Sequence, residues 1–117
     1  MRILPFIILI VIATSCAQSP KKADANPQFY GEFLFLTDAA VLNTGTEIYG
    51  VVIDEKMKEL HELCSSIKRD EYDMIPVYIK GKVHNKPADE EGWDKRIKIT
   101  SIDSLVNPSD NSILKPN

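Results

Sequence analysis

Few side chains in this sequence are capable of nucleophilic or metal chemistry. A nucleophile needs an oriented base, and a soft metal needs clustered thiolate, thioether or imidazole ligands. The available groups are scattered and form no Cys-x-x-Cys or methionine-rich motif: Met57, His61, Cys64, Met74 and His84. The sequence therefore predicts no enzyme, no metal site and no cofactor. Accessory copper handling is kept as an alternative.

Cys16 has the most specific context of these groups. A single positive charge at Arg2 and a short apolar run precede it, and the run ends in Ala13-Thr14-Ser15-Cys16. These are the parts of a secretory signal peptide. The ending resembles the bacterial lipobox, in which the cysteine gains a thioether-linked diacylglycerol and becomes the new N-terminus. We expect residues 1–15 to be a lipoprotein signal peptide and Cys16 to be lipidated; an ordinary signal peptide and a retained anchor are the alternatives.

The apolar run also limits how the chain meets a membrane. A run of roughly ten residues is too short to span ~30 Å of hydrocarbon, whereas two or more acyl chains hold a protein firmly. Residues 16–28 are small and polar with two prolines, which predicts a flexible tether. No aspartate follows Cys16, which favours the outer membrane, facing the periplasm.

Charge and cysteine content narrow the function classes. The net charge of −3 makes the chain a poor ligand for polyanions, so no nucleic-acid partner is expected. With Cys16 lipidated, Cys64 is the last thiol and no intrachain disulfide forms. Cys64 lies on the apolar side of an expected helix, where cysteine usually behaves as a small buried hydrophobe. Stability must then come from packing.

The remaining residues predict one β-rich domain over 29–106, followed by a loose tail over 107–117. Apolar runs at 31–36 and 39–43 indicate two strands or one bent strand, and 47–53 is rich in β-branched residues. Asp54 suits an N-cap, and apolar residues three or four apart predict a helix over 55–68. Strict alternation over 75–84 predicts a strand with one buried face, and a final strand follows from Arg96.

This order of elements predicts a mainly β fold. Three strands, a helix and two strands match the OB-like fold, a five-stranded Greek-key barrel with one helix between strands 3 and 4. An open β-sandwich and a mixed α+β sheet are alternatives with similar periodicity.

Three segments carry a resemblance to a known family. Residues 31–42 are similar to the opening of the C-terminal OB-like domain of NlpE-like envelope lipoproteins, a family linked to copper homeostasis and surface-stress signalling. Residues 60–63 and 75–81 extend the similarity, which covers residues 30–105. It implies an OB-like fold and an envelope location. The family's two-domain members also have an N-terminal barrel with paired cysteines that has no counterpart here, so a copper or kinase-signalling role residing in that barrel is not carried over.

Two surfaces are candidate binding sites. If the last two strands pair, a basic face with one aromatic side chain forms on an acidic protein, suited to anionic lipid head groups or an acidic envelope protein. The alternative is a solvated face whose lysines discourage edge association. Trp93, in a loop that OB-folds often use for binding, either anchors a protein partner or caps the open end of the barrel. The candidates are Tyr78, Lys80, Lys82, Trp93, Arg96 and Lys98, with His84 beside them.

The preferred interpretation is a non-enzymatic envelope lipoprotein that presents an OB-like interaction module, with a role in envelope stress or surface sensing. A purely structural tether is a further alternative to the copper-handling one.

Overall fold

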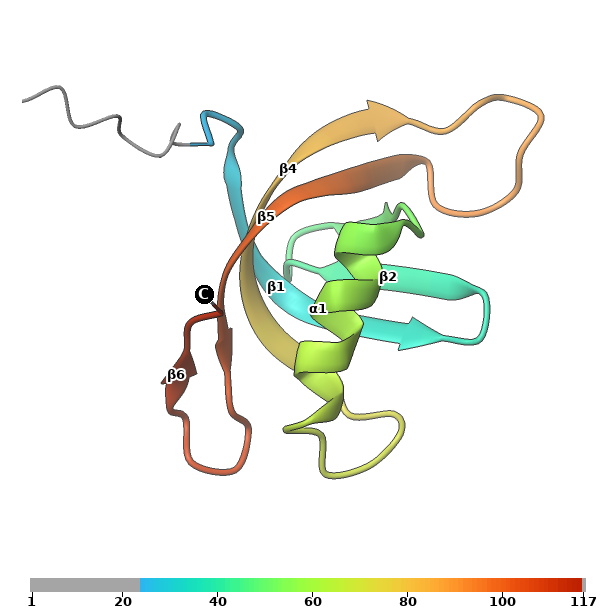
Figure 1. Cartoon of the computed structure of the whole chain (residues 1–117). Coiled ribbons are helices and arrows are strands. Elements are labelled where there is room, and N and C mark those ends of the chain that lie inside the picture. The colour runs from blue at the N-terminus through green and yellow to red at the C-terminus, as the bar shows by residue number, and fades with distance from the viewer. Residues whose placement is uncertain (1–23, 117) are drawn as a thin grey trace, which may run out of the picture.

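The protein is described here by a computed structural model covering residues 24–116. The expected signal peptide and Cys16 lie outside the described residues. Within them the chain forms six strands and one helix (Figure 1). In chain order these are β1 (Gln28–Leu36), β2 (Ala39–Asn43), β3 (Ile48–Val51), α1 (Glu55–Ser65), β4 (Ile75–Asn85), β5 (Lys95–Val106) and β6 (Ile113–Leu114).

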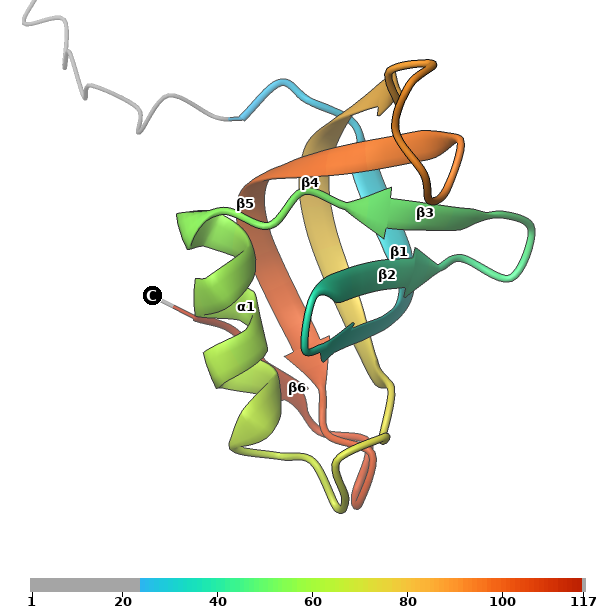
Figure 2. The same ribbon diagram turned by 90° about the vertical axis from the view of Figure 1, so that its right-hand side faces the viewer.

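The first five strands close into a barrel. β1 pairs antiparallel with both β2 and β4, β2 with β3, and β4 with β5. A short parallel pairing between β3 and β5, with Gly50 opposite Arg96 and Val51 opposite Ile97, completes the ring. Figure 2 shows β3 and the first part of β5 side by side, to the right of the upper end of α1. The predicted mainly β fold is confirmed: an OB-like barrel of five strands with one helix between strands 3 and 4.

Apolar and polar residues alternate along the strands, so that the apolar side chains point into the barrel and fill it. Ile75, Val77 and Ile79 of β4 are fully buried, as the period of two predicts. Ile97 and Ile99 of β5 are buried beside them. The helix contributes a stripe at the expected spacing, Met57, Leu60 and Cys64, which is also fully buried. The thiol of Cys64 is therefore a core group, as predicted.

The helix begins where the sequence predicts and ends earlier. An Asp54 carboxylate oxygen accepts a hydrogen bond from the Met57 amide at 3.0 Å, which caps the first turn. The helix was expected to reach residue 68 but ends at Ser65. The Ser66 hydroxyl donates to the Leu63 carbonyl at 2.7 Å, and the Ile67 amide turns to the Cys64 carbonyl instead. Local serine hydrogen bonds of this kind compete with helix continuation.

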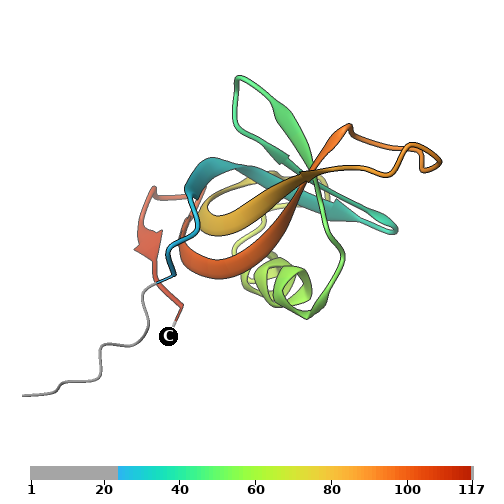
Figure 3. The same ribbon diagram turned by 90° about the horizontal axis from the view of Figure 1, so that it is seen from above.

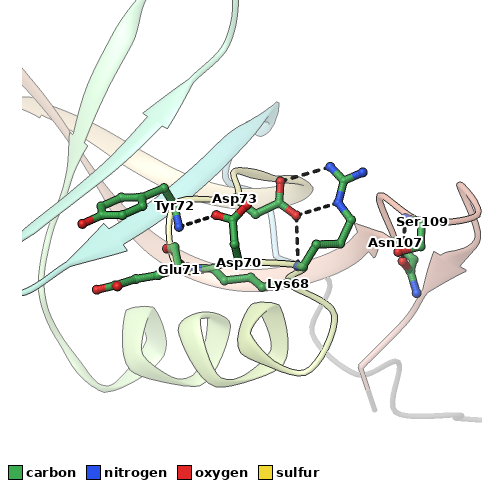
Figure 4. Close-up of polar contacts among 8 residues, drawn as sticks. Lys68, Asp70, Glu71, Tyr72, Asp73, Asn107 and Ser109 are labelled. Carbon is green, nitrogen blue, oxygen red and sulfur yellow. Dashed lines mark hydrogen bonds and ion pairs between the residues drawn. The ribbon is translucent and has the colours of Figure 1, made fainter.

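The connection from α1 to β4 is held by its own polar side chains. In Figure 4 the Asp73 carboxylate accepts two hydrogen bonds from a guanidinium group, which belongs to Arg69; the nitrogen–oxygen distances are 3.0 and 3.2 Å. These bonds hold the pKa of Asp73 below its ordinary value. The Asp70 carboxylate accepts from the Tyr72 amide in the same turn. The polar groups of this loop are thus used to fix the loop itself.

The C-terminal segment corrects the expectation of a loose tail. β5 continues to Val106 with Leu105 almost fully buried, and residues 107–112 form a turn that returns the chain as β6. β6 lies beside the end of β5 (Figure 1), with Leu114 paired with Leu105 and Ile113 with Val106. The side-chain oxygens of Asn107 and Asp110 accept hydrogen bonds from the amides of Ser109 and Ser112, which stabilises this turn. The polar composition that predicted a tail therefore encodes a hairpin.

The end of the expected tether is also ordered against the barrel. The Thr100 hydroxyl donates to the Asp24 carboxylate, and the Asn26 amide and side chain donate to the same carboxylate at 2.9 and 2.7 Å. The Pro27 carbonyl accepts from the Gly81 amide at 3.2 Å. The tether was expected to be flexible through residue 28, but residues 24–28 dock on β4 and β5. Among residues 24–116, no helix is both long enough and apolar enough to cross a bilayer.

Candidate functional site

A groove of about 290 Å³ lies on the outside of the barrel between the β1–β2 turn and the β4–β5 loop. Figure 2 shows this loop descending over β3. The floor comes from the start of β2 and the end of β3, where the backbone is covered by small and β-branched residues. The walls come from the turn and the loop: Asp38 on one side and Glu91, Gly92 and Trp93 on the other, with Arg96 of β5 at the edge.

Trp93 packs on the bare backbone of β3. Leu42 of β2 points into the core, so its neighbour Val41 lies on the outer face of the strand. Gly50 pairs with Val41 and therefore lies on the same outer face. A Cβ atom on Gly50 would lie 3.4 Å from the Trp93 Cβ and 3.5 Å from its Cδ1. The indole remains 47% exposed. Of the two roles proposed for Trp93, capping the barrel end does not fit this position; it stands beside an open groove on the barrel wall.

Arg96 fixes the loop that carries Trp93. Its guanidinium lies 2.6 Å from a Glu90 carboxylate oxygen and donates to the Glu91 carbonyl at 3.1 Å. Gly92 has a φ of 118°, which only glycine adopts without strain, and a Cβ atom added to it would lie 3.6 Å from the same guanidinium. The loop is thus held before any ligand arrives, which lowers the entropy that binding would otherwise lose.

The charge of the groove is negative. Glu90 neutralises Arg96, whereas Asp38 and Glu91 take part in no ion pair within the described part of the chain. A half-exposed indole flanked by carboxylates suits a cationic or amphipathic group, because both the ring face and the carboxylates attract positive charge. Gly50 and Asp38 are the site residues that the sequence reasoning missed. The only sequence signal for Gly50 was a glycine interrupting a β-branched strand.

The expected basic face divides into two parts. β4 and β5 pair as predicted, with Lys82 opposite Lys98 and His84 opposite Arg96. Lys98, however, lies 2.8 Å from an Asp54 carboxylate oxygen. Burial raises the pKa of Asp54, but the bonds from Lys98 and the helix amide outweigh it and the pKa is lowered on balance. Lys98 thus stabilises the helix start, and Arg96 belongs to the groove.

The other part of the basic face consists of Tyr78, Lys80 and Lys82, together with a residue that the sequence reasoning missed. Tyr30 of β1 pairs with Tyr78 of β4, and their rings lie 4.6 Å apart at 36° on the outside of the barrel. Tyr30 is 51% exposed. Lys80 and Lys82 continue the same outward row and form no ion pair among residues 24–116. We call this set the tyrosine–lysine face. Tyr30 alternates with buried Gly31 and Phe33, which is the signal that could have found it.

The soft-metal candidates do not converge. Burial raises the pKa of the Cys64 thiol to about 12, and His61 packs edge-on against Phe35 at 5.0 Å. His84 stands on the exposed end of β4. Between residues 24 and 116 no three side chains of histidine, cysteine, aspartate or glutamate gather in a way that could hold a metal ion.

Comparisons with known proteins give no relative. No family model matches the chain, and neither a curated protein nor a solved structure is significantly similar to it. The resemblance to NlpE-like lipoproteins therefore stays a prediction, and the groove and the tyrosine–lysine face are the two surfaces that bear on function.

Proposed function

We propose that this protein is a non-enzymatic envelope lipoprotein, anchored through Cys16 to the outer membrane and facing the periplasm. Its OB-like barrel binds an envelope protein in the groove beside Trp93, in a role in envelope stress or surface sensing. The observation that carries the proposal is the half-exposed Trp93 held over Gly50 by a loop that is itself fixed by Arg96.

The position of the groove supports a binding role. OB-folds bind their ligands on the face of strands 2 and 3, between the loop joining strands 1 and 2 and the loop joining strands 4 and 5. Asp38 lies in the first of these connections and Trp93 in the second. Tryptophan is enriched among residues that dominate binding energy, because its large ring buries much area with little loss of side-chain freedom.

The chemistry of the groove indicates the kind of protein segment it takes. Asp38 and Glu91 disfavour an acidic partner, and the apolar floor disfavours a fully polar one. A segment presenting lysine or arginine next to an apolar side chain satisfies both, with the cation over the indole. In such a contact, truncation of Trp93 removes about 2 kcal/mol or more of binding free energy.

The anchor is tested by the intact mass of the protein purified from bacterial membranes. A chain that begins at Cys16 and carries acyl chains supports the proposal, and Cys16→Ser should abolish the modification. A soluble chain without lipid would remove the anchor from the proposal.

The groove is tested by photo-crosslinking in living cells from a reactive amino acid placed at position 93. The matched control is position 72, where Tyr72 is an aromatic residue that is 68% exposed on the α1–β4 connection. We expect a defined adduct with one envelope protein from position 93 and none from position 72. The partner should then bind purified protein, with weaker binding by Trp93→Ala and unchanged binding by Tyr72→Ala. The same adducts from both positions would refute the groove and favour a structural tether.

A further inference from the structure

The N-terminal end of the described chain lies beside the tyrosine–lysine face. Gln28 pairs with Lys80, and the carbonyl of Pro27 accepts from the amide of Gly81, between Lys80 and Lys82. Asp24 and Asn26 are then bonded to Thr100 on the neighbouring strand. Seen from above, the chain approaches β1 along β4 and β5, whereas α1 lies on the other side of these strands (Figure 3).

The docking of residues 24–28 shortens the distance that the anchor can span. Seven residues separate Cys16 from Asp24, so the two α-carbons are eight residue steps apart and a fully extended chain joins them over about 28 Å. A tether free through residue 28 would reach about 42 Å. If Cys16 holds the lipid, as proposed above, the barrel stays close to the bilayer, with the part nearest Asp24 turned towards it.

The residues at that part have the chemistry of a membrane interface. Tyrosine is enriched at the level of the lipid head groups because its ring is apolar and its hydroxyl polar. Lysines near an anionic surface strengthen association electrostatically. The acidic side chain on this side of β1, Glu32, lies opposite Pro76 at the far end of the paired strands.

The carboxylates closest to the tether are held by other groups. Asp24 accepts bonds from Thr100 and Asn26, which lower its pKa to about 2. Asp103 accepts from the Gln28 side chain at 2.6 Å. Neither forms an ion pair with Lys80 or Lys82, so both ammonium groups remain available for an anionic partner.

We propose that the tyrosine–lysine face (Tyr30, Tyr78, Lys80 and Lys82) docks the barrel on anionic phospholipid head groups of the membrane that holds its own anchor. The inference rests on the proposed lipid anchor and adds an orientation to it. With this face on the membrane, the Trp93 groove on the β2–β3 side of the barrel is left for its protein partner.

The test is a lysine acylation footprint of the lipidated protein, read by mass spectrometry. The protein is reconstituted into vesicles of phosphatidylcholine alone or of phosphatidylcholine and phosphatidylglycerol in equal amounts. Lys56 and Lys58 on α1 are the internal reference, since both are at least 39% exposed. Each docked lysine strengthens association roughly fivefold, so Lys80 and Lys82 should react at least fivefold more slowly on the anionic vesicles. Concentrated salt should remove the protection.

A pair of variants tests the same face through its tyrosines. Iodination of Tyr30 and Tyr78, measured against Tyr72, should be suppressed on anionic vesicles for the wild type. Lys80→Glu with Lys82→Glu should lower the ratio of docked to free protein about 30-fold or more and restore iodination. The charge-matched control, Lys56→Glu with Lys58→Glu, should keep the suppression. Circular dichroism checks that both variants fold.

The outcomes separate this inference from the proposed anchor. Lipidated protein whose Lys80 and Lys82 react equally fast on both vesicles would overturn the docking face and leave the anchor intact. If intact mass shows no lipid, the same footprint is made on chain added to the vesicles. Protection there would support the face although the anchor had failed, and equal reactivity would overturn the face as well.

Discussion

The reactivity of Cys64 tests both the core packing and the alternative of copper handling. The residue is fully buried on α1, and burial raises the pKa of its thiol from an ordinary 9.0 to about 12. Because the thiolate is the reactive and metal-binding form, this rise lowers the thiolate fraction at pH 8 about a thousandfold. The native protein should therefore react with a disulfide reagent at least a thousandfold more slowly than the unfolded chain.

The assay is release of the coloured thiol from an aromatic disulfide reagent, with and without guanidinium chloride. In lipidated protein one thiol per chain should react, and only with denaturant present. An unlipidated Cys16 would add a second thiol that reacts at once, so the same trace reports on the anchor. Labelling of Cys64 in the native state within tenfold of the unfolded rate would refute the buried-thiol reasoning.

Two substitutions and a pH series extend the prediction. Cys64→Ser places a hydroxyl in an apolar core and should lower the free energy of unfolding by about 1–3 kcal/mol, more than Cys64→Ala, which adds no polar atom. Folding raises the thiol pKa, so the unfolded chain releases its proton first. The contribution of Cys64 to stability is thus complete below about pH 9 and is lost as the pH rises towards 12. Equal stability of the two variants would contradict the apolar environment.

Three further predictions concern the strands and the helix that build the two surfaces. In Gly81→Ala the new Cβ would lie 2.6 Å from the Lys98 carbonyl oxygen. The free energy of unfolding, measured by chemical denaturation, should therefore fall by about 1–3 kcal/mol, and an unchanged midpoint would argue against this close approach. Thr37 has a φ of 47° at the β1–β2 turn, which is strained for a β-branched residue. Thr37→Gly should therefore stabilise the protein by about 1 kcal/mol, and a lower melting temperature would contradict the strain. Asp54→Ala removes the helix cap and should lower the free energy of unfolding by about 1–2 kcal/mol at pH 7. Folding lowers the pKa of Asp54, so that contribution should disappear as the pH falls below about 4; a difference from wild type that persists in acid would assign it to packing instead.

The two surfaces differ in how far sequence reasoning could reach them. Alternation along β4 is enough to place Tyr78, Lys80 and Lys82 on one side, because the strand period is a local property. Alternation along β1 could also place Tyr30 on an outer face, but its position beside Tyr78 depends on the pairing of β1 with β4, which joins residues about fifty positions apart. The pairing of Lys98 with Asp54 likewise depends on how α1 returns to β5.

The segments that were predicted as unstructured show the same limit. Residues 24–28 and 107–116 are polar and contain prolines, a composition shared by flexible chain and by ordered turns. Their order depends on partners elsewhere: Thr100 and Gly81 for the first segment, and Leu105 and Val106 for the second. Composition alone carries no record of those partners.

The sequence by itself determined the order of the five barrel strands and the helix, the N-cap at Asp54 and the burial of Cys64, because these follow from short-range periodicity and hydrogen bonding within a few residues. It also set the expectation of a lipid on Cys16. Only the tertiary structure decided that β3 meets β5, that Trp93 rests on Gly50 beside an open groove, and that Tyr30 joins Tyr78 next to the docked end of the tether. Those contacts depend on barrel closure, which brings distant strands to one register and so fixes which side chains share a face.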